Sequence, residues 1–70
     1  MEEIKTISKL KWARQMRGLS QSALAEKAGV PVRVIRSYEI NYRDINGASA
    51  LTVYRLATAL DVKMEELLNI

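Results

Sequence analysis

The segment 20-SQSALAEKAGVPVRVIRSYEI-40 decides the fold, because two stretches with helical spacing lie on either side of Gly29. In the first stretch the apolar residues recur at intervals that place them on one helix face. These residues are Leu24, Ala25 and Ala28. Ser20 is a typical N-cap residue and Gly29 a typical helix terminator. We therefore predict a helix from Gln21 to about Ala28.

The second stretch predicts a helix with a mixed outer face. This helix is expected to begin near Pro31, because proline suits the first helical position. A rotation of about 100° per residue then divides its side chains between an inner and an outer side. The inner side carries Pro31, Ile35, Tyr38 and Glu39, and the outer side carries Val32, Arg33, Arg36, Ser37 and Ile40, with Val34 at the edge. Two short helices joined by a tight turn predict a helix-turn-helix over residues 20–40.

The composition limits the chemistry available to the chain. Seventy residues form one domain at most, so we assign residues 1–70 to a single domain, with residues 1–5 as a candidate disordered end. The sequence has no Cys and no His, which excludes disulfides, Cys/His zinc sites and imidazole catalysis. It also lacks a glycine-rich nucleotide loop and paired carboxylates. We therefore expect no enzyme and no catalytic residues, metal, cofactor or small-molecule substrate.

Positive charge is concentrated in the first part of the chain. Residues 1–43 contain nine Lys or Arg against four Asp or Glu, whereas residues 44–70 contain two against four. An anionic partner would favour this asymmetry, although a solvated surface produces the same count. No apolar run is long enough to span a bilayer, which predicts a soluble, cytoplasmic protein with no membrane partner.

Three further helices are expected. The first runs from about Thr6 to Arg17 and ends at Gly18. Its inner arc contains Ile7, Leu10, Ala13, Arg14 and Arg17.

The remaining two helices follow the turn-rich loop 41–47, after which Asn46 or Ser49 can act as the N-cap. One helix runs from about Ala50 to Leu60, and the last is a short helix from about Met64 to Leu68. The buried side of the longer one contains Val53, Tyr54, Leu56, Ala57 and Leu60. No segment alternates with the period of a strand, so the predicted fold is all-α and compact, with five short helices.

Ordered motifs extend well beyond the two central helices. They are SQxxLAxxAGVxxxxIxxYE at 20–39, LATALDV at 56–62 and ELL at 66–68. Together they resemble the phage-repressor and Cro-like (XRE-type, lambda-repressor-like) helix-turn-helix family from Leu10 to Leu68. Such a long match of ordered spacings is more specific than a lone short motif. The resemblance implies a five-helix lambda-repressor-like domain that binds double-stranded DNA, commonly as a dimer, with the helix after Pro31 in the major groove.

The resemblance also implies residue roles. It assigns Val32, Arg33 and Ser37 to base-facing positions and Gln21 to a phosphate contact. It further implies that Arg14 and Glu39 form a structural pair, which connects the first helix to the helix after Pro31.

The side-chain chemistry is compatible with these roles. Arg33 can donate two hydrogen bonds to guanine O6 and N7, and Val32 or Val34 can contact a thymine methyl group. Arg36 is better suited to a phosphate, as are Tyr42 and Arg43 in the loop. The alternative for each polar residue is a solvated surface position, and for Val32 it is packing at the edge of the core.

Trp12 and Met16 form an apolar pair on the face of the first helix opposite Leu10 and Ala13. One interpretation is that the N-terminal residues or the last helix cover this pair. The other is a protein interface, since aromatic and thioether groups are enriched at interfaces.

We therefore expect a sequence-specific DNA-binding transcriptional regulator that prefers an inverted-repeat operator, with a homodimer as an open possibility. The alternative is a helix-turn-helix scaffold for protein–protein interaction, for example with a toxin or a polymerase subunit. The absence of Gln and Asn from the outer face of the second motif helix favours this alternative, whereas the basic half and Gln21 favour DNA.

Overall fold

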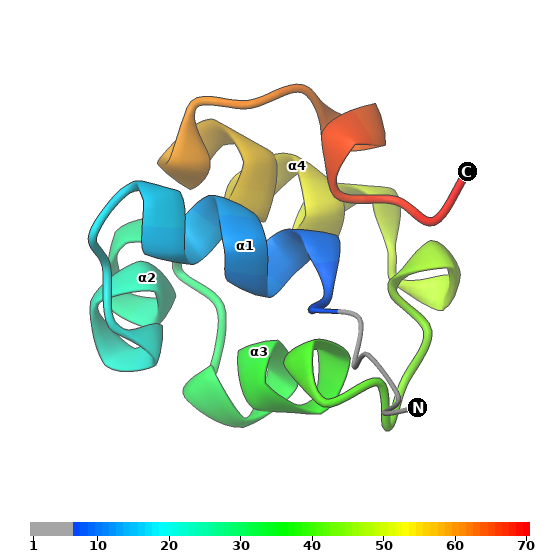
Figure 1. The fold of residues 1–70 in the computed structure, drawn as a ribbon, viewed down its shortest axis with the longest axis horizontal. Helices are drawn as coiled ribbons and strands as arrows, with labels where there is room; N and C mark the ends of the chain where they lie inside the picture. Colours follow the sequence, from blue (N-terminus) through cyan, green and yellow to red (C-terminus); the bar gives the residue numbers. More distant parts are fainter. Residues whose placement is uncertain (1–6) are drawn as a thin grey trace, which may run out of the picture.

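The computed structural model describes residues 7–70, so the prediction for residues 1–5 lies outside the described part. Four α-helices and two short 3-10 helices follow one another (Figure 1): α1 (Lys9–Met16), α2 (Gln21–Ala28), α3 (Val32–Glu39), η1 (Ile45–Gly47), α4 (Ala50–Leu60) and η2 (Met64–Glu66). The predicted all-α class is confirmed for residues 7–70. The short fifth helix expected from about Met64 to Leu68 is a 3-10 helix over Met64–Glu66, so the described residues contain four α-helices.

Serine side chains begin three of the α-helices. The hydroxyl oxygens of Ser8, Ser20 and Ser49 each accept a hydrogen bond from the backbone N–H three residues later. Each bond satisfies one N–H that has no partner within the helix. The bounds of α2 and α4 therefore fall where the sequence placed them.

Left-handed residues end the helices. Gly18 and Gly29 have φ angles of 69° and 71°, and Asp61 has a φ angle of 57° at the end of α4. An L-residue pays a steric cost in this conformation that glycine avoids. Gly29 thereby reverses the chain between α2 and α3 within three residues.

The first helix is shorter than expected. It begins at Lys9, because Ser8 caps it, and the predicted start at Thr6 lies outside the described residues. Ile7 precedes the cap and is exposed, so its assignment to the inner arc was wrong. Arg17 is also exposed, although its guanidinium donates to the Leu60 and Asp61 carbonyls (2.7 and 3.1 Å) and so joins the ends of α1 and α4.

Two further assignments need correction. Pro31 is the N-cap of α3, one residue before the helix, and it is exposed, so its assignment to the inner side of the helix was wrong. Tyr54 was expected to be buried, but it is 57% exposed. It lies on α4 beside the buried Val53, and the helical rotation turns it outward.

A single apolar cluster holds the elements together. Its fully buried side chains come from every α-helix and from the segment after η2: Leu10, Leu24, Ile35, Leu56, Leu60 and Leu67. α2 packs against both α3 and α4, and α1 packs against α3. Because the cluster takes the inner face of α3, the opposite face of this helix is directed outward (Figure 1).

No helix among residues 7–70 has the length and apolar character required to cross a membrane.

Candidate nucleic-acid interface

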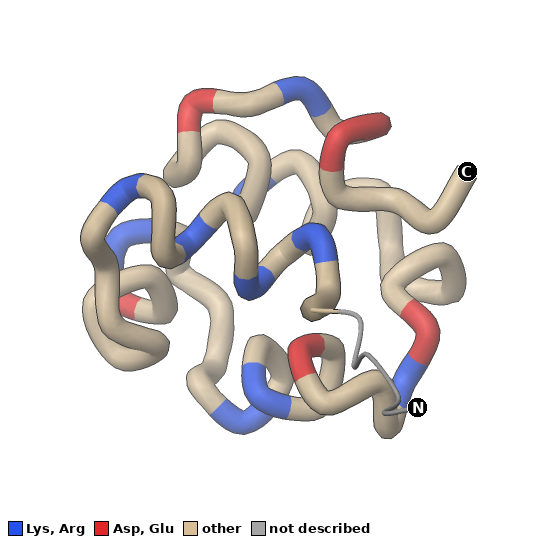
Figure 2. Tube along the Cα trace, viewed as in Figure 1, with Lys and Arg blue, Asp and Glu red and all other residues tan. Residues whose placement is uncertain are grey.

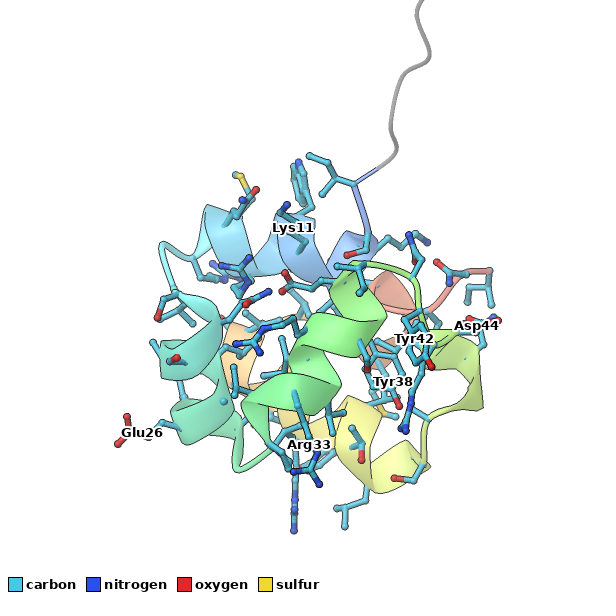
Figure 3. The ribbon with its side chains drawn as sticks, turned by 90° about the horizontal axis from the view of Figure 1, so that it is seen from below. Lys11, Glu26, Arg33, Tyr38, Tyr42 and Asp44 are labelled. Atoms are coloured by element: carbon cyan, nitrogen blue, oxygen red, sulfur yellow. The ribbon has the colours of Figure 1, made fainter. Side chains whose placement is uncertain are left out.

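The outer face of α3 is accessible. Arg33 and Arg36 are exposed, whereas Val32 and Ser37 are half-buried. Arg33 points away from the bundle, on the opposite side of the view from Lys11 of α1 (Figure 3). The inner face carries the buried Ile35, as the helical rotation requires.

The loop after α3 folds back along this helix. The backbone N–H groups of Tyr42 and Arg43 both donate to the Ser37 carbonyl oxygen, at 2.9 and 3.2 Å. Asn41 makes the reversal with a φ angle of 61°. Asn is one of the few side chains that tolerate this conformation, a signal that the sequence analysis overlooked.

A shallow concavity of about 200 Å³ forms where the loop meets α3. Arg33, Val34 and Ser37 line one side of it, and Tyr42 and Arg43 line the other. The structure therefore brings two of the predicted base-facing residues together with both predicted loop residues. Val32 lies outside this concavity, nearer the start of α3.

Ser37 has only part of its expected hydrogen-bonding capacity free. Its hydroxyl donates to the Val34 carbonyl oxygen at 2.8 Å, so the hydroxyl proton is already used. The lone pairs of Oγ remain for an external donor.

Arg14 and Glu39, the predicted structural pair, lie in contact beneath this face. The Arg14 Nε and Nη2 atoms donate to Glu39 Oε2 and Oε1 at 2.6 and 2.9 Å, and Nη1 donates to the Leu19 carbonyl oxygen at 2.8 Å. The two side chains are only 10% and 2% exposed. Arg14 thus connects α1 both to the end of α3 and to the turn that enters α2.

The pair fixes the charge of Arg14. The hydrogen bond with Glu39 raises the pKa of the Arg14 guanidinium above its ordinary value, against the opposing effect of burial, and the Coulomb attraction of Glu39 adds to the rise. A raised pKa contributes stability at every pH below the unfolded value, and this contribution is lost as the pH rises through the folded value. Arg14 therefore keeps its charge until the pH is strongly alkaline.

Gln21 occupies the first turn of α2, next to this pair. Its Nε2 atom donates to Glu39 Oε1 at 3.0 Å, and its Oε1 atom accepts from Arg36 Nε at 3.4 Å. The sequence predicts a phosphate contact for this side chain, and in the structure it bridges α2 and α3. Beside it, the first backbone N–H groups of α2 have no intrahelical acceptor.

Basic side chains dominate the outer side of α3. This helix carries Arg33 and Arg36, and its one acidic residue, Glu39, is buried against Arg14. Figure 2 shows basic positions along α1 and α3, whereas the turn around η2 is acidic. An anion approaching α3 therefore meets positive charge.

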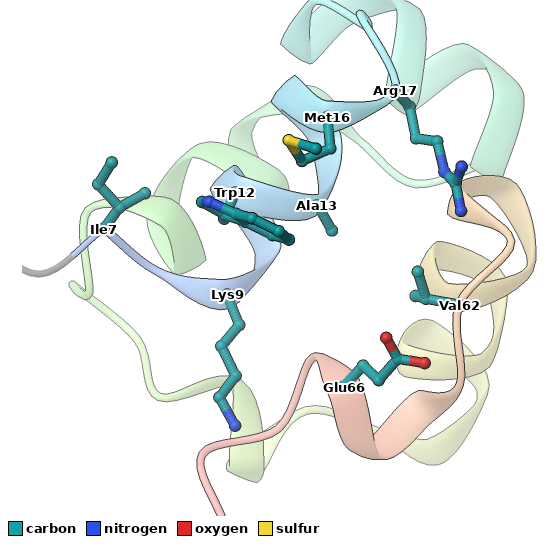
Figure 4. Close-up of a pocket in the computed structure, with 8 residues that line it drawn as sticks. All are labelled: Ile7, Lys9, Trp12, Ala13, Met16, Arg17, Val62 and Glu66. Atoms are coloured by element: carbon teal, nitrogen blue, oxygen red, sulfur yellow. The ribbon is translucent and has the colours of Figure 1, made fainter.

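A second hollow lies on α1. Trp12 and Met16 are 57% and 64% exposed and border a groove of about 600 Å³, with Val62 and Glu66 on its opposite wall (Figure 4). The last turn therefore lines this groove and does not cover the aromatic ring. The other residues expected to cover Trp12 and Met16, at the N-terminal end, include residues 1–6, which lie outside the described part of the chain.

Among residues 7–70, no group of Asp, Glu, His or Cys side chains is arranged to hold a metal ion.

Comparison with known proteins gives a consistent result. The family described as helix-turn-helix matches residues 10–67. No curated protein matches the sequence. Among solved structures, the chain is similar to the restriction-modification controller protein C.AhdI from Aeromonas hydrophila, with 34% sequence identity and a TM-score of 0.74 over 84% of this chain and 85% of that one.

The chain is also similar to SinR. A crystal structure of this master regulator for biofilm formation, in complex with DNA, has 34% identity and a TM-score of 0.79 over 87% of this chain and 94% of that one. The N-terminal DNA binding domain of SinR from Bacillus subtilis gives 34% identity and the same TM-score, over 89% of this chain and 87% of that one.

Proposed function

Because the chain belongs to the helix-turn-helix family (XRE type, Cro-like), whose members are transcription factors and not enzymes, we propose that it is a sequence-specific transcriptional regulator that inserts α3 into the major groove of duplex DNA. The outward, basic face of α3 is the observation that carries this proposal. The solved complex of SinR with DNA supports it, since that fold is shared at 34% identity.

Three residues are proposed to face the bases. Arg33 is exposed beside the concavity and can form two hydrogen bonds with guanine. Ser37 acts as an acceptor, because its proton is donated to Val34, so its partner is an amino group of adenine or cytosine. Val32 contacts a thymine methyl group.

Four residues are proposed to contact phosphates. Gln21 begins α2, and Arg36 of α3 donates a hydrogen bond to it. At this helix start, free N–H groups and the helix dipole favour an anion. Tyr42 and Arg43 line the concavity opposite Arg33 and Ser37. These contacts set the position of α3 without reading sequence.

The operator follows from geometry if two copies bind together. A homodimer prefers an inverted repeat whose half-site centres lie about 34 to 36 Å apart, one turn of the duplex. We also propose that residues 1–70 form one domain with its motif at 20–40, and that the protein acts in the cytoplasm.

Selection of bound fragments from random duplex DNA tests the proposal. We expect an enriched sequence that binds the purified protein, with an affinity that falls steeply as salt increases. Failure to retain duplex DNA even at low ionic strength would reject the proposed function.

A second candidate function is protein binding through the groove beside Trp12. α1 carries Lys9, Lys11 and Arg14 and no acidic residue, and Arg17 follows it as the C-cap. Lys9 and Arg17 line the groove, with Glu66 as its one acidic residue. This charge favours an acidic amphipathic segment of another protein, whose apolar residues would contact Trp12 and Met16.

Fluorescence of Trp12 tests this candidate. A helical peptide with leucines four residues apart, flanked by Glu, should shift the emission to shorter wavelength, whereas its Lys counterpart should not. An unchanged spectrum with both peptides rejects the candidate. A shift that depends only on the concentration of the protein itself also rejects it, and assigns the groove to a second copy of the chain.

A further inference from the structure

Four polar side chains from three helices form one connected series beneath the proposed phosphate contact. Arg14 of α1 binds Glu39 of α3, Glu39 accepts from Gln21 of α2, and Gln21 accepts from Arg36 of α3. The series runs from a carboxylate whose side chain is 2% exposed to a guanidinium at the surface. Gln21 is the uncharged member through which the other residues are linked to the start of α2.

The two neighbours of Gln21 have opposite hydrogen-bonding character. An ionised carboxylate only accepts hydrogen bonds, so the atom of Gln21 that faces Glu39 must be the donor, Nε2. A guanidinium only donates, so the atom that faces Arg36 must be the acceptor, Oε1. Both partners therefore select the same orientation of the amide.

This orientation leaves one donor free. The amide nitrogen carries two protons, and Glu39 accepts one of them. The second proton remains for an external acceptor, beside the free backbone N–H groups at the start of α2. The reversed amide would replace this donor with an acceptor oxygen, which cannot bond to a phosphate oxygen.

We propose that Glu39 and Arg36 are positioning residues, which hold the Gln21 amide so that one N–H of Nε2 is presented to a DNA phosphate. The inference rests on the proposed function and deepens it, because it assigns the direction in which Gln21 faces the backbone. Glu39 acts without touching DNA. Arg36 orients Gln21 through Nε and keeps its two terminal nitrogens for the same phosphate.

A double-mutant cycle on duplex affinity tests the proposal. Glu39→Gln keeps the size of the side chain but can donate toward Gln21, so it no longer selects one amide orientation. We expect this variant to bind the selected duplex about tenfold more weakly, the value of one hydrogen bond to a charged group. In a Gln21→Ala background the same change should cost less than about twofold, because its target is absent.

Glu26→Gln is the matched control. It removes the same charge from α2, where Glu26 is exposed and points away from the bundle (Figure 3). Its affinity should equal or slightly exceed that of the unchanged protein. Arg36→Lys should retain most of the affinity, because Lys also only donates, whereas Arg36→Met should not.

A measurement on the unchanged protein covers the case in which Glu39→Gln unfolds. The Nε2 proton of Gln21 that faces Glu39 should give an NMR signal shifted from that of an exposed amide such as Gln15, and the signal of the other Nε2 proton should move when duplex is added. Nε2 proton signals in the free protein that match those of Gln15 would overturn the inference. So would a Glu39→Gln cost that persists in the Gln21→Ala background, whereas absence of duplex binding by the unchanged protein rejects the proposed function itself.

Discussion

Individual residues decide how the proposed interface reads DNA. The sequence placed Arg33, Arg36 and Ser37 on the outer side of α3 because helical rotation alone determines the direction of a side chain. It could not show that the Ser37 proton is bonded to Val34, or that Gln21 reaches Glu39, which lies 18 positions away in the chain. Such contacts depend on how the helices pack, and sequence spacing contains no information about that packing.

Arg33→Ala should relax specificity at one base pair. If the guanidinium reads guanine, its loss should reduce discrimination at that pair by about 1 to 3 kcal/mol and leave other positions unaffected. Competition binding between the selected duplex and its single-pair variants measures this. Equal discrimination at every position before and after the change would remove Arg33 from the base-reading set.

Glu39→Ala should destabilise the protein strongly. The change leaves the buried Arg14 guanidinium without its carboxylate, which costs about 3 kcal/mol and lowers the melting temperature by about 12 to 24 °C in a domain of this size. Thermal unfolding followed by circular dichroism provides the measurement. Glu26→Ala, at an exposed position, should change the melting temperature little, and an equal effect of both changes would contradict the pairing.

At the scale of elements, the capping signals were the most informative part of the sequence. Ser20, Gly29 and Ser49 fixed the bounds of α2 and α4, because caps act within a few residues of their own position. The prediction of a last helix over residues 64–68 differs from the structure for a related reason. A segment of five residues is too short to form a stable α-helix alone, and here it forms a 3-10 helix over Met64–Glu66. Tyr54 shows that a helix face predicted too broadly includes exposed residues.

Gly29→Ala tests the turn between α2 and α3. The position has a φ angle of 71° and open space around an added methyl group, so backbone strain alone should cost about 1 to 2 kcal/mol. Gly47 is the matched control, since it also has open space but no positive φ angle. Urea unfolding should show a clear loss for Gly29→Ala and little for Gly47→Ala, and similar losses would exclude strain as the cause.

At the scale of the whole molecule, two surfaces have different character. The outer face of α3 is basic and joined to a folded-back loop, whereas α1 presents the exposed Trp12 beside a groove. The charge asymmetry of the sequence indicated an anionic partner, and the structure adds that the acidic residue of α3 is buried. The groove could not be predicted, because its walls come from opposite ends of the chain.

Salt dependence separates charged from uncharged phosphate contacts. Arg36→Ala and Arg43→Ala should each reduce the steepness of the plot of log affinity against log salt concentration by about one unit. Each variant protein neutralises one phosphate fewer, so its binding releases about one counterion fewer. Gln21→Ala should weaken binding to all sequences alike and keep the slope, because the amide is neutral. Titrations at several salt concentrations give these slopes, and a changed slope for Gln21→Ala would contradict its assignment.

The most direct test of the α3 interface is an NMR titration of the labelled protein with the selected duplex at low salt. We predict that the backbone signals that move most belong to the outer side of α3 and the start of α2, including Arg33, Arg36 and Gln21, while those around Trp12 and Met16 stay in place. The account is contradicted if no signal moves, or if the largest changes surround Trp12 and leave α3 unaffected.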